Sequence, residues 1–65
     1  MNNFQISITD DNDLLVWRNT EQGLTNIIIN NDGIAYSYIA KDKSKRILKF
    51  NLTNQDVIKL IEENG

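Results

Sequence analysis

The tetrapeptide Asn-Asn-Asp-Gly at Asn30–Gly33 constrains the fold more than any other part of the sequence. It separates two runs rich in β-branched and aromatic residues, Leu24–Ile29 and Ile34–Ala40. Asp-Gly between such runs is a strong hairpin signal, because glycine adopts a positive φ without steric cost. A third run of this kind, Arg46–Phe50, follows one short polar turn later. We therefore predict a three-stranded antiparallel meander over residues 24–50.

The register of the first hairpin has two solutions. If Asn31 and Asp32 form a type I turn with Gly33 as a bulge residue, Ile28 faces Tyr36. If all four residues of the tetrapeptide form the loop, Ile27 faces Tyr36 instead. The choice matters because a one-residue slip exchanges the two faces of the first strand.

The second turn, Lys41–Ser44, contains no glycine. A four-residue loop there predicts Tyr38 opposite Ile47 and Ile39 opposite Arg46. Alternation along the strand expected over Ile34–Ala40 separates its side chains into two sets. Ile34, Tyr36 and Tyr38 point to one face of the sheet, and Ala35, Ser37 and Ile39 point to the other.

The N-terminal third predicts one strand and one ambiguous segment. Phe4–Thr9 alternates apolar and polar residues, which is typical of a half-buried strand. Asp10–Asp13 favours a turn. Leu14–Arg18 is expected to return as a strand because Val and Trp favour a pleated surface, although a helix over residues 11–19 competes with this reading.

The C-terminal segment is predicted to be a helix with a capping box at Thr53 and Asp56 and an ending at Asn64-Gly65. Val57, Ile58, Leu60 and Ile61 give it an apolar stripe. We expect this stripe to pack on the face that carries Ala35, Ile39, Leu48 and Phe50. The predicted fold is a single α+β domain over residues 1–65, an antiparallel β-meander of four or five strands with one C-terminal helix packed on one face (β-β-β-β-α).

Composition argues against several functions. The 65 residues include no cysteine and no histidine, which removes disulfides, the thiol nucleophile and the common zinc ligands. Asp10–Asp13 fails the EF-hand pattern, since the fifth and sixth positions are Leu14 and Leu15. We expect no enzymatic activity, no cofactor and no metal. The longest uninterrupted apolar run is Leu14–Trp17, far short of a membrane span, so we expect a cytoplasmic protein.

Charge is unevenly distributed along the chain, although the net charge is only −2. Residues 1–32 carry one positive and five negative side chains, and residues 33–51 carry five positive and one negative. The basic residues of the second segment are Lys41, Lys43, Lys45, Arg46 and Lys49. They suggest nucleic-acid binding as an alternative function. The net negative charge of the whole chain argues against this alternative.

The face that the helix leaves open suggests the preferred function. One helix of about a dozen residues covers one face of the sheet, and an exposed apolar face is unusual on a stable monomer. We therefore predict a non-catalytic protein-interaction or regulatory module that acts through this sheet face as a homodimer. The interface residues expected from this reasoning are Ile34, Tyr36, Tyr38, Ile47 and Trp17.

Overall fold

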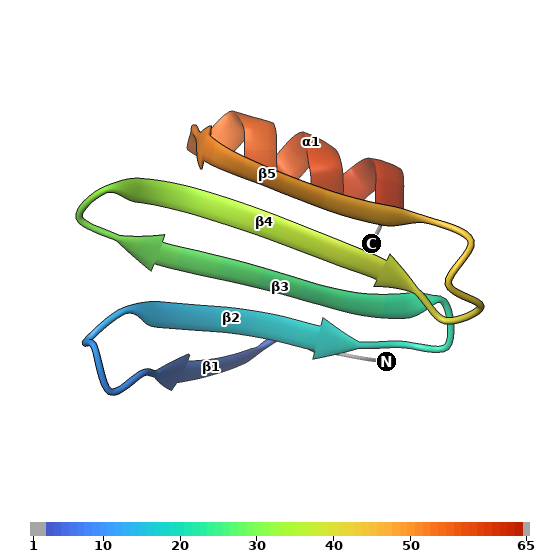
Figure 1. The fold of residues 1–65 in the computed structure, drawn as a ribbon, viewed down its shortest axis with the longest axis horizontal. Helices are drawn as coiled ribbons and strands as arrows, with labels where there is room; N and C mark the ends of the chain where they lie inside the picture. The colour runs from blue at the N-terminus through green and yellow to red at the C-terminus, as the bar shows by residue number, and fades with distance from the viewer. Residues whose placement is uncertain (1–2, 65) are drawn as a thin grey trace.

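The computed structural model describes residues 3–64, which form five antiparallel strands followed by one helix (Figure 1). The strands follow one another in the sheet in sequence order, so the sheet is a simple meander. This confirms the predicted fold class. The elements are β1 (Gln5–Ile8), β2 (Leu14–Asn19), β3 (Gly23–Asn30), β4 (Gly33–Ala40), β5 (Arg46–Leu52) and α1 (Asn54–Asn64).

The ambiguous segment after the first turn is a strand, as preferred. β2 pairs with β1 on one side and with β3 on the other, so that Val16 lies opposite both Ile6 and Ile27. The turn before β2 is held by the Asp13 N–H, which donates to the Thr9 hydroxyl at 3.1 Å. Asn12 has a φ of 66° in this turn, a conformation that asparagine tolerates well.

The central hairpin adopts the second of its two registers. Ile29 pairs with Ile34 and Ile27 pairs with Tyr36. The ladder continues to Asn30 opposite Gly33, which leaves only two residues at the tip. The Asn30 side chain closes the turn by accepting the N–H of Asp32 at 2.8 Å.

The β4–β5 register agrees with the four-residue loop. Tyr38 pairs with Ile47, Ile39 pairs with Arg46, and the N–H of Ala40 donates to the carbonyl of Lys45 at 2.9 Å. Toward the end of β5 the pairing shifts by one residue. This β-bulge includes Asn51, whose φ is 57°.

The helix begins with the predicted capping box. The Thr53 N–H donates to the Asp56 carboxylate at 3.0 Å, and the Asp56 N–H donates to the Thr53 hydroxyl at 3.1 Å. At its other end the Asn64 side chain donates to the carbonyl of Leu60. Gly65, the other residue of the expected ending, lies outside the described residues.

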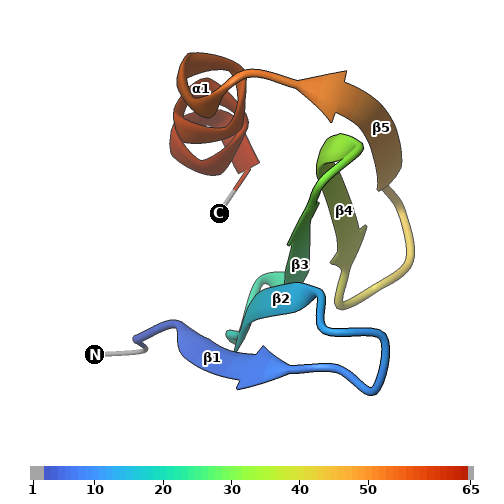
Figure 2. The same cartoon turned by 90° about the vertical axis from the view of Figure 1, so that its left-hand side faces the viewer.

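The prediction of the sheet face on which the helix docks was wrong. The sheet is curved, and α1 lies on its concave side (Figure 2). The buried core is formed there by Ile27, Tyr36, Tyr38 and Val57, with Leu52, Leu60 and Ile61 packed around it. The helix therefore covers the tyrosine face of β4 and leaves open the face of Ala35, Ile39, Leu48 and Phe50.

The bulge in β5 explains this difference. Strict alternation would place Leu52 on the same face as Leu48 and Phe50. Because the bulge inserts one residue, Leu52 instead pairs with Ile34 and joins the concave core. The chain thus leaves β5 toward the concave side, and the helix follows it.

Candidate interaction surface

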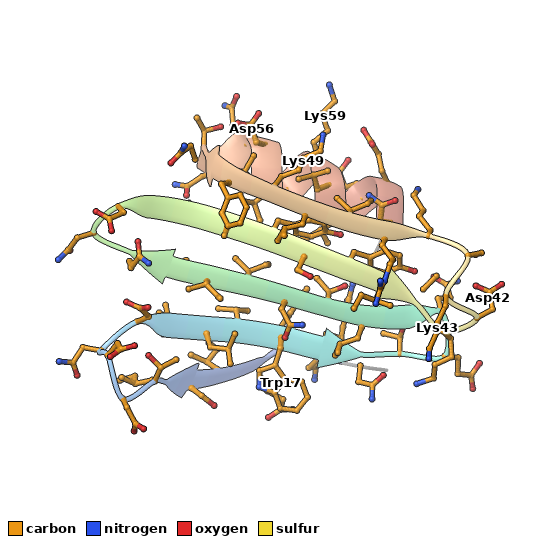
Figure 3. All side chains as sticks on the ribbon, in the orientation of Figure 1. Trp17, Asp42, Lys43, Lys49, Asp56 and Lys59 are labelled. Carbon is orange, nitrogen blue, oxygen red and sulfur yellow. The ribbon has the colours of Figure 1, made fainter. Side chains whose placement is uncertain are left out.

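Most of the expected interface residues lie under the helix. Tyr36 is fully buried and Tyr38 is 5% exposed, and Ile34 and Ile47 pack against the same core. Trp17 pairs with Asn26 of β3 and projects from the opposite, convex face. Figure 3 shows it at the β1–β2 side of the sheet, away from α1. The structure therefore does not bring these five side chains together on one surface.

Both tyrosine hydroxyls have structural partners. Tyr36 donates to the carbonyl of Leu60 at 3.4 Å, and Tyr38 donates to the carbonyl of Gln22 at 3.2 Å. Burial raises the pKa of Tyr36 above its ordinary value, and the neighbouring Tyr38 raises it further. These contacts hold the helix and the β2–β3 turn against the sheet, so both tyrosines stabilise the fold.

The convex face is an apolar surface that the described residues leave uncovered. It contains side chains from four strands, namely Leu15, Trp17, Leu24, Ile28, Ala35, Ile39, Leu48 and Phe50. No element within residues 3–64 packs over it (Figure 2). Leu48 and Phe50 are each 64% exposed.

A hollow of about 270 Å³ interrupts this face near the β3–β4 turn. Ile28, Ala35 and Phe50 provide apolar walls, and Asp13 and Asp32 stand among the lining residues. Alanine at position 35 leaves the space between the larger side chains of β3 and β5. The convex face is thus uneven, with ridges of aliphatic and aromatic side chains beside a depression.

The concave side has a second apolar feature beside the helix. A groove of about 390 Å³ is lined by Val16, Ile27, Ile29, Ile34, Asn54, Val57 and Ile58. On β1, Ile6 and Ile8 project to this same side of the sheet and remain largely exposed. The helix therefore covers β3 to β5 and leaves the β1 side of the concave face open.

The basic residues proposed as a nucleic-acid site point in several directions. Lys41 donates to the Asn19 side chain at 3.1 Å, and Lys45 donates to the Asn64 side chain at the end of α1. Arg46 pairs with Ile39 on the convex face, whereas Lys49 pairs with Tyr36 on the other. Lys43 lies at the tip of the turn, far from Lys49 (Figure 3). The five cations do not form one patch.

Sequence reasoning missed a contact between Arg18 and Phe4. The Arg18 guanidinium carbon lies 4.3 Å from the centroid of the Phe4 ring, within the range of a cation–π interaction. Within the described residues, the Arg18 Nε is buried without a hydrogen-bond partner. The β1–β2 register is the signal that would have found this pair, since Gln5 lies opposite Trp17 and the next positions along are 4 and 18.

No metal-binding cluster adds to these surfaces within residues 3–64. Among residues 3–64, no three His, Cys, Asp or Glu side chains are close enough to hold a metal ion. The only helix in that range is α1, which is too short to cross a membrane. Comparison with known protein families, curated proteins and solved structures gives no match.

Proposed function

We propose that this chain is a non-catalytic protein-interaction module that acts through its convex sheet face, with a second copy of itself as the partner. The observation that carries the proposal is the uncovered apolar surface on β2 to β5. Contiguous apolar patches of this kind are uncommon on stable monomers and mark sites of protein interaction. A small domain also gains much of its stability from any further apolar burial.

Two-fold pairing of the convex faces is the simplest way to bury this surface. A two-fold contact uses the same patch on both copies, so the patch needs only to complement itself. Sheets that pack face to face interdigitate their side chains at a separation of about 10 Å. The ridge formed by Leu48 and Phe50 and the hollow above Ala35 provide the two shapes that such packing requires.

Ser37→Arg tests this proposal. Ser37 lies on the convex face of β4, opposite Leu48, so a long charged side chain there blocks close approach without removing any apolar group. We expect the parent chain to sediment as a dimer at micromolar concentration, with Trp17 emission that shifts to the blue on association. At the same micromolar concentration the Ser37→Arg chain should be monomeric, with a circular dichroism spectrum like that of the parent.

Gln55→Arg is the matched control, because Gln55 is exposed on the helix and lies away from the convex face. It introduces the same charge and should leave the dimer intact. A parent chain that remains monomeric up to near-millimolar concentration would contradict the proposal. Equal dissociation constants for the Ser37→Arg and Gln55→Arg chains would contradict it as well.

A further inference from the structure

The two edges of the sheet carry opposite charge. β1 and β5 are the outer strands, and each is paired on one side only. β1 leads into Asp10 and Asp11, in the segment of net charge −4, and β5 begins at Arg46, in the segment of net charge +4. An edge strand offers unpaired backbone groups to another strand. The edges of this sheet therefore differ in a way that favours pairing of one with the other.

Backbone hydrogen bonds show which residues present free groups at each edge. The Thr9 N–H donates to Asp13, so odd-numbered residues of β1 direct their N–H and C=O groups toward β2. Ile6 and Ile8 therefore direct theirs outward. On the other edge, the Ala40 N–H donates to Lys45, and the same alternation leaves Arg46 and Leu48 with outward-facing groups.

We propose that β1 of one copy adds antiparallel to β5 of a second copy, which extends the sheet across the two chains. In the register that we propose, Ile8 lies opposite Leu48 of the second copy and Ile6 lies opposite its Phe50. Asp10 then reaches Arg46 of the second copy. The Ile8–Leu48 pair joins two residues with outward-facing backbone groups, so its ladder hydrogen bonds form as well.

Side-chain direction agrees with this register independently. β1 and β5 run the same way within one chain, so antiparallel addition turns the second copy over. The concave side of the first copy then continues into the convex side of the second. Ile6 and Ile8 project to the concave side, and Leu48 and Phe50 project to the convex side, so all four meet. They are the four most exposed large apolar side chains described, at 64–74%.

Other pairings of the edges fit less well. Parallel addition would place Ile6 and Ile8 on the side of Lys49, and it would separate Asp10 from Arg46. Pairing of two β1 strands would bring the acidic segments of both copies together. The β1–β5 contact uses two different patches, so it forms open assemblies or rings. It goes beyond the pairing of convex faces and does not require it.

Reciprocal charge reversal tests the contact. Asp10→Arg and Arg46→Asp are each made in the Ser37→Arg chain, so that face pairing does not contribute. Each variant alone places like charges at the β1–β5 contact, whereas a mixture restores an attractive pair at every contact. We expect the mixture to associate roughly tenfold more tightly than either variant alone, by fluorescence anisotropy at low salt. Equal affinities would overturn the proposal.

Two controls separate this contact from other effects. Glu21→Arg and Lys59→Asp change the same charges at exposed positions outside the two edges, and their mixture should show no gain. Ile6→Pro removes an outward-facing N–H and keeps the β1–β2 ladder, so it should abolish the gain in the charge-reversed mixture. A gain that survives Ile6→Pro would overturn the strand-pairing mode. Because all these chains carry Ser37→Arg, failure here leaves the face-pairing test unaffected.

Discussion

The hydroxyl of Tyr36 lies 3.4 Å from the carbonyl oxygen of Leu60, and this contact joins the centre of the sheet to the last turn of the helix. It shows that the helix is docked on the tyrosine face and not on the face of Leu48 and Phe50. Tyr36 is completely buried. A small movement of the helix would therefore take the Leu60 carbonyl away from the Tyr36 hydroxyl while the hydroxyl stayed shielded from water, which is costly. The position of the helix is thereby fixed by a polar group as well as by apolar packing.

Tyr36→Phe should lower the free energy of unfolding by about 0.5–1 kcal/mol, because it removes one hydrogen bond and keeps the ring. The pKa of Tyr36 is raised in the folded chain above the ordinary value of 10.0. The unfolded state therefore loses this proton first as pH rises. The corresponding stability is complete below pH 10.0 and is lost progressively above it.

Thermal melts between pH 8 and pH 12 measure this effect. We expect the melting temperature of the parent to fall more steeply above pH 10.0 than that of Tyr36→Phe. Tyr38→Phe is a suitable comparison, since it removes the bond to Gln22 and leaves the Tyr36 contact in place. Identical pH profiles for the parent and Tyr36→Phe would show that Tyr36 does not titrate differently in the two states.

Gly23→Ala should destabilise the fold through backbone contact. A Cβ at position 23 would lie 2.5 Å from the carbonyl oxygen of Ile39 and 2.8 Å from the hydroxyl of Tyr38. The Tyr38 hydroxyl has some freedom to move, but the carbonyl belongs to the neighbouring strand. We expect a loss of about 1–3 kcal/mol in urea denaturation. Gly23→Ala/Tyr38→Phe should recover little of it, and full recovery would show that only the hydroxyl was in the way.

Both turns of the central meander and the helix start follow from local sequence, but the docking face of the helix does not. Asn30–Gly33, the spacing of Lys41–Ser44 and the pair Thr53 and Asp56 each encode a structure within a few residues. Only the register of the first hairpin needed tertiary information, because both candidate turns suit its sequence. The C-terminal helix was likewise evident from its apolar stripe.

The bulge in β5 lies beyond what local sequence signals. Asn51 adopts a positive φ, and no residue in Lys49–Leu52 predicts this conformation as strongly as a glycine would. One inserted residue reversed the face on which Leu52 lies, and with it the side that the helix covers. The expected interface was therefore assigned to a buried face, whereas the predicted strands and their inner and outer side chains on β4 were right.

The ionisation of Asp56 makes the stability of the helix start depend on pH. The bonds that its carboxylate makes with Thr53 hold its pKa below the ordinary value of 3.8, and nearby Lys59 and Lys49 lower it further. The folded state thus favours the ionised form. This stability is present above pH 3.8 and is lost as pH falls through the lowered pKa.

Thr53→Ala should cost about 1 kcal/mol at pH 7, as is usual for the loss of a helix N-cap residue, whereas Thr53→Ser should cost little. Asp56→Asn should reduce the loss of stability between pH 5 and pH 2 seen in acid-dependent melts of the parent. Asp42 also has a lowered pKa, through its bonds with Ser44, so Asp42→Asn serves as the comparison. A parent whose stability is flat over this range would contradict the role of Asp56.

The dispersed cations of the β4–β5 turn and of β5 predict weak attraction to nucleic acid. We expect the chain to elute from heparin at or below about 0.15 M salt, because few of its cations can act together and the net charge is negative. Lys43→Glu with Lys45→Glu should shift this elution only slightly. Retention to much higher salt, abolished by the same two substitutions, would favour the nucleic-acid function instead.

The two neighbouring helix residues Val57 and Ile58 should respond in opposite ways to a charge. Val57 is 8% exposed and packs on the tyrosine core, while Ile58 is 55% exposed at the open groove. A carboxylate buried without a partner is costly, so Val57→Asp should lower the free energy of unfolding by at least about 2 kcal/mol. Ile58→Asp should change it far less, since its side chain already meets water.

Urea denaturation followed by circular dichroism measures both variants, and Val57→Ala separates loss of packing from burial of charge. Docking of the helix on the concave side requires that the loss of stability decreases in the order Val57→Asp, Val57→Ala, Ile58→Asp. If the helix instead covered Leu48 and Phe50, Leu48→Asp would be as damaging as Val57→Asp. We expect Leu48→Asp to leave the monomer folded, because the helix packs on the other side of the sheet and Leu48 is 64% exposed.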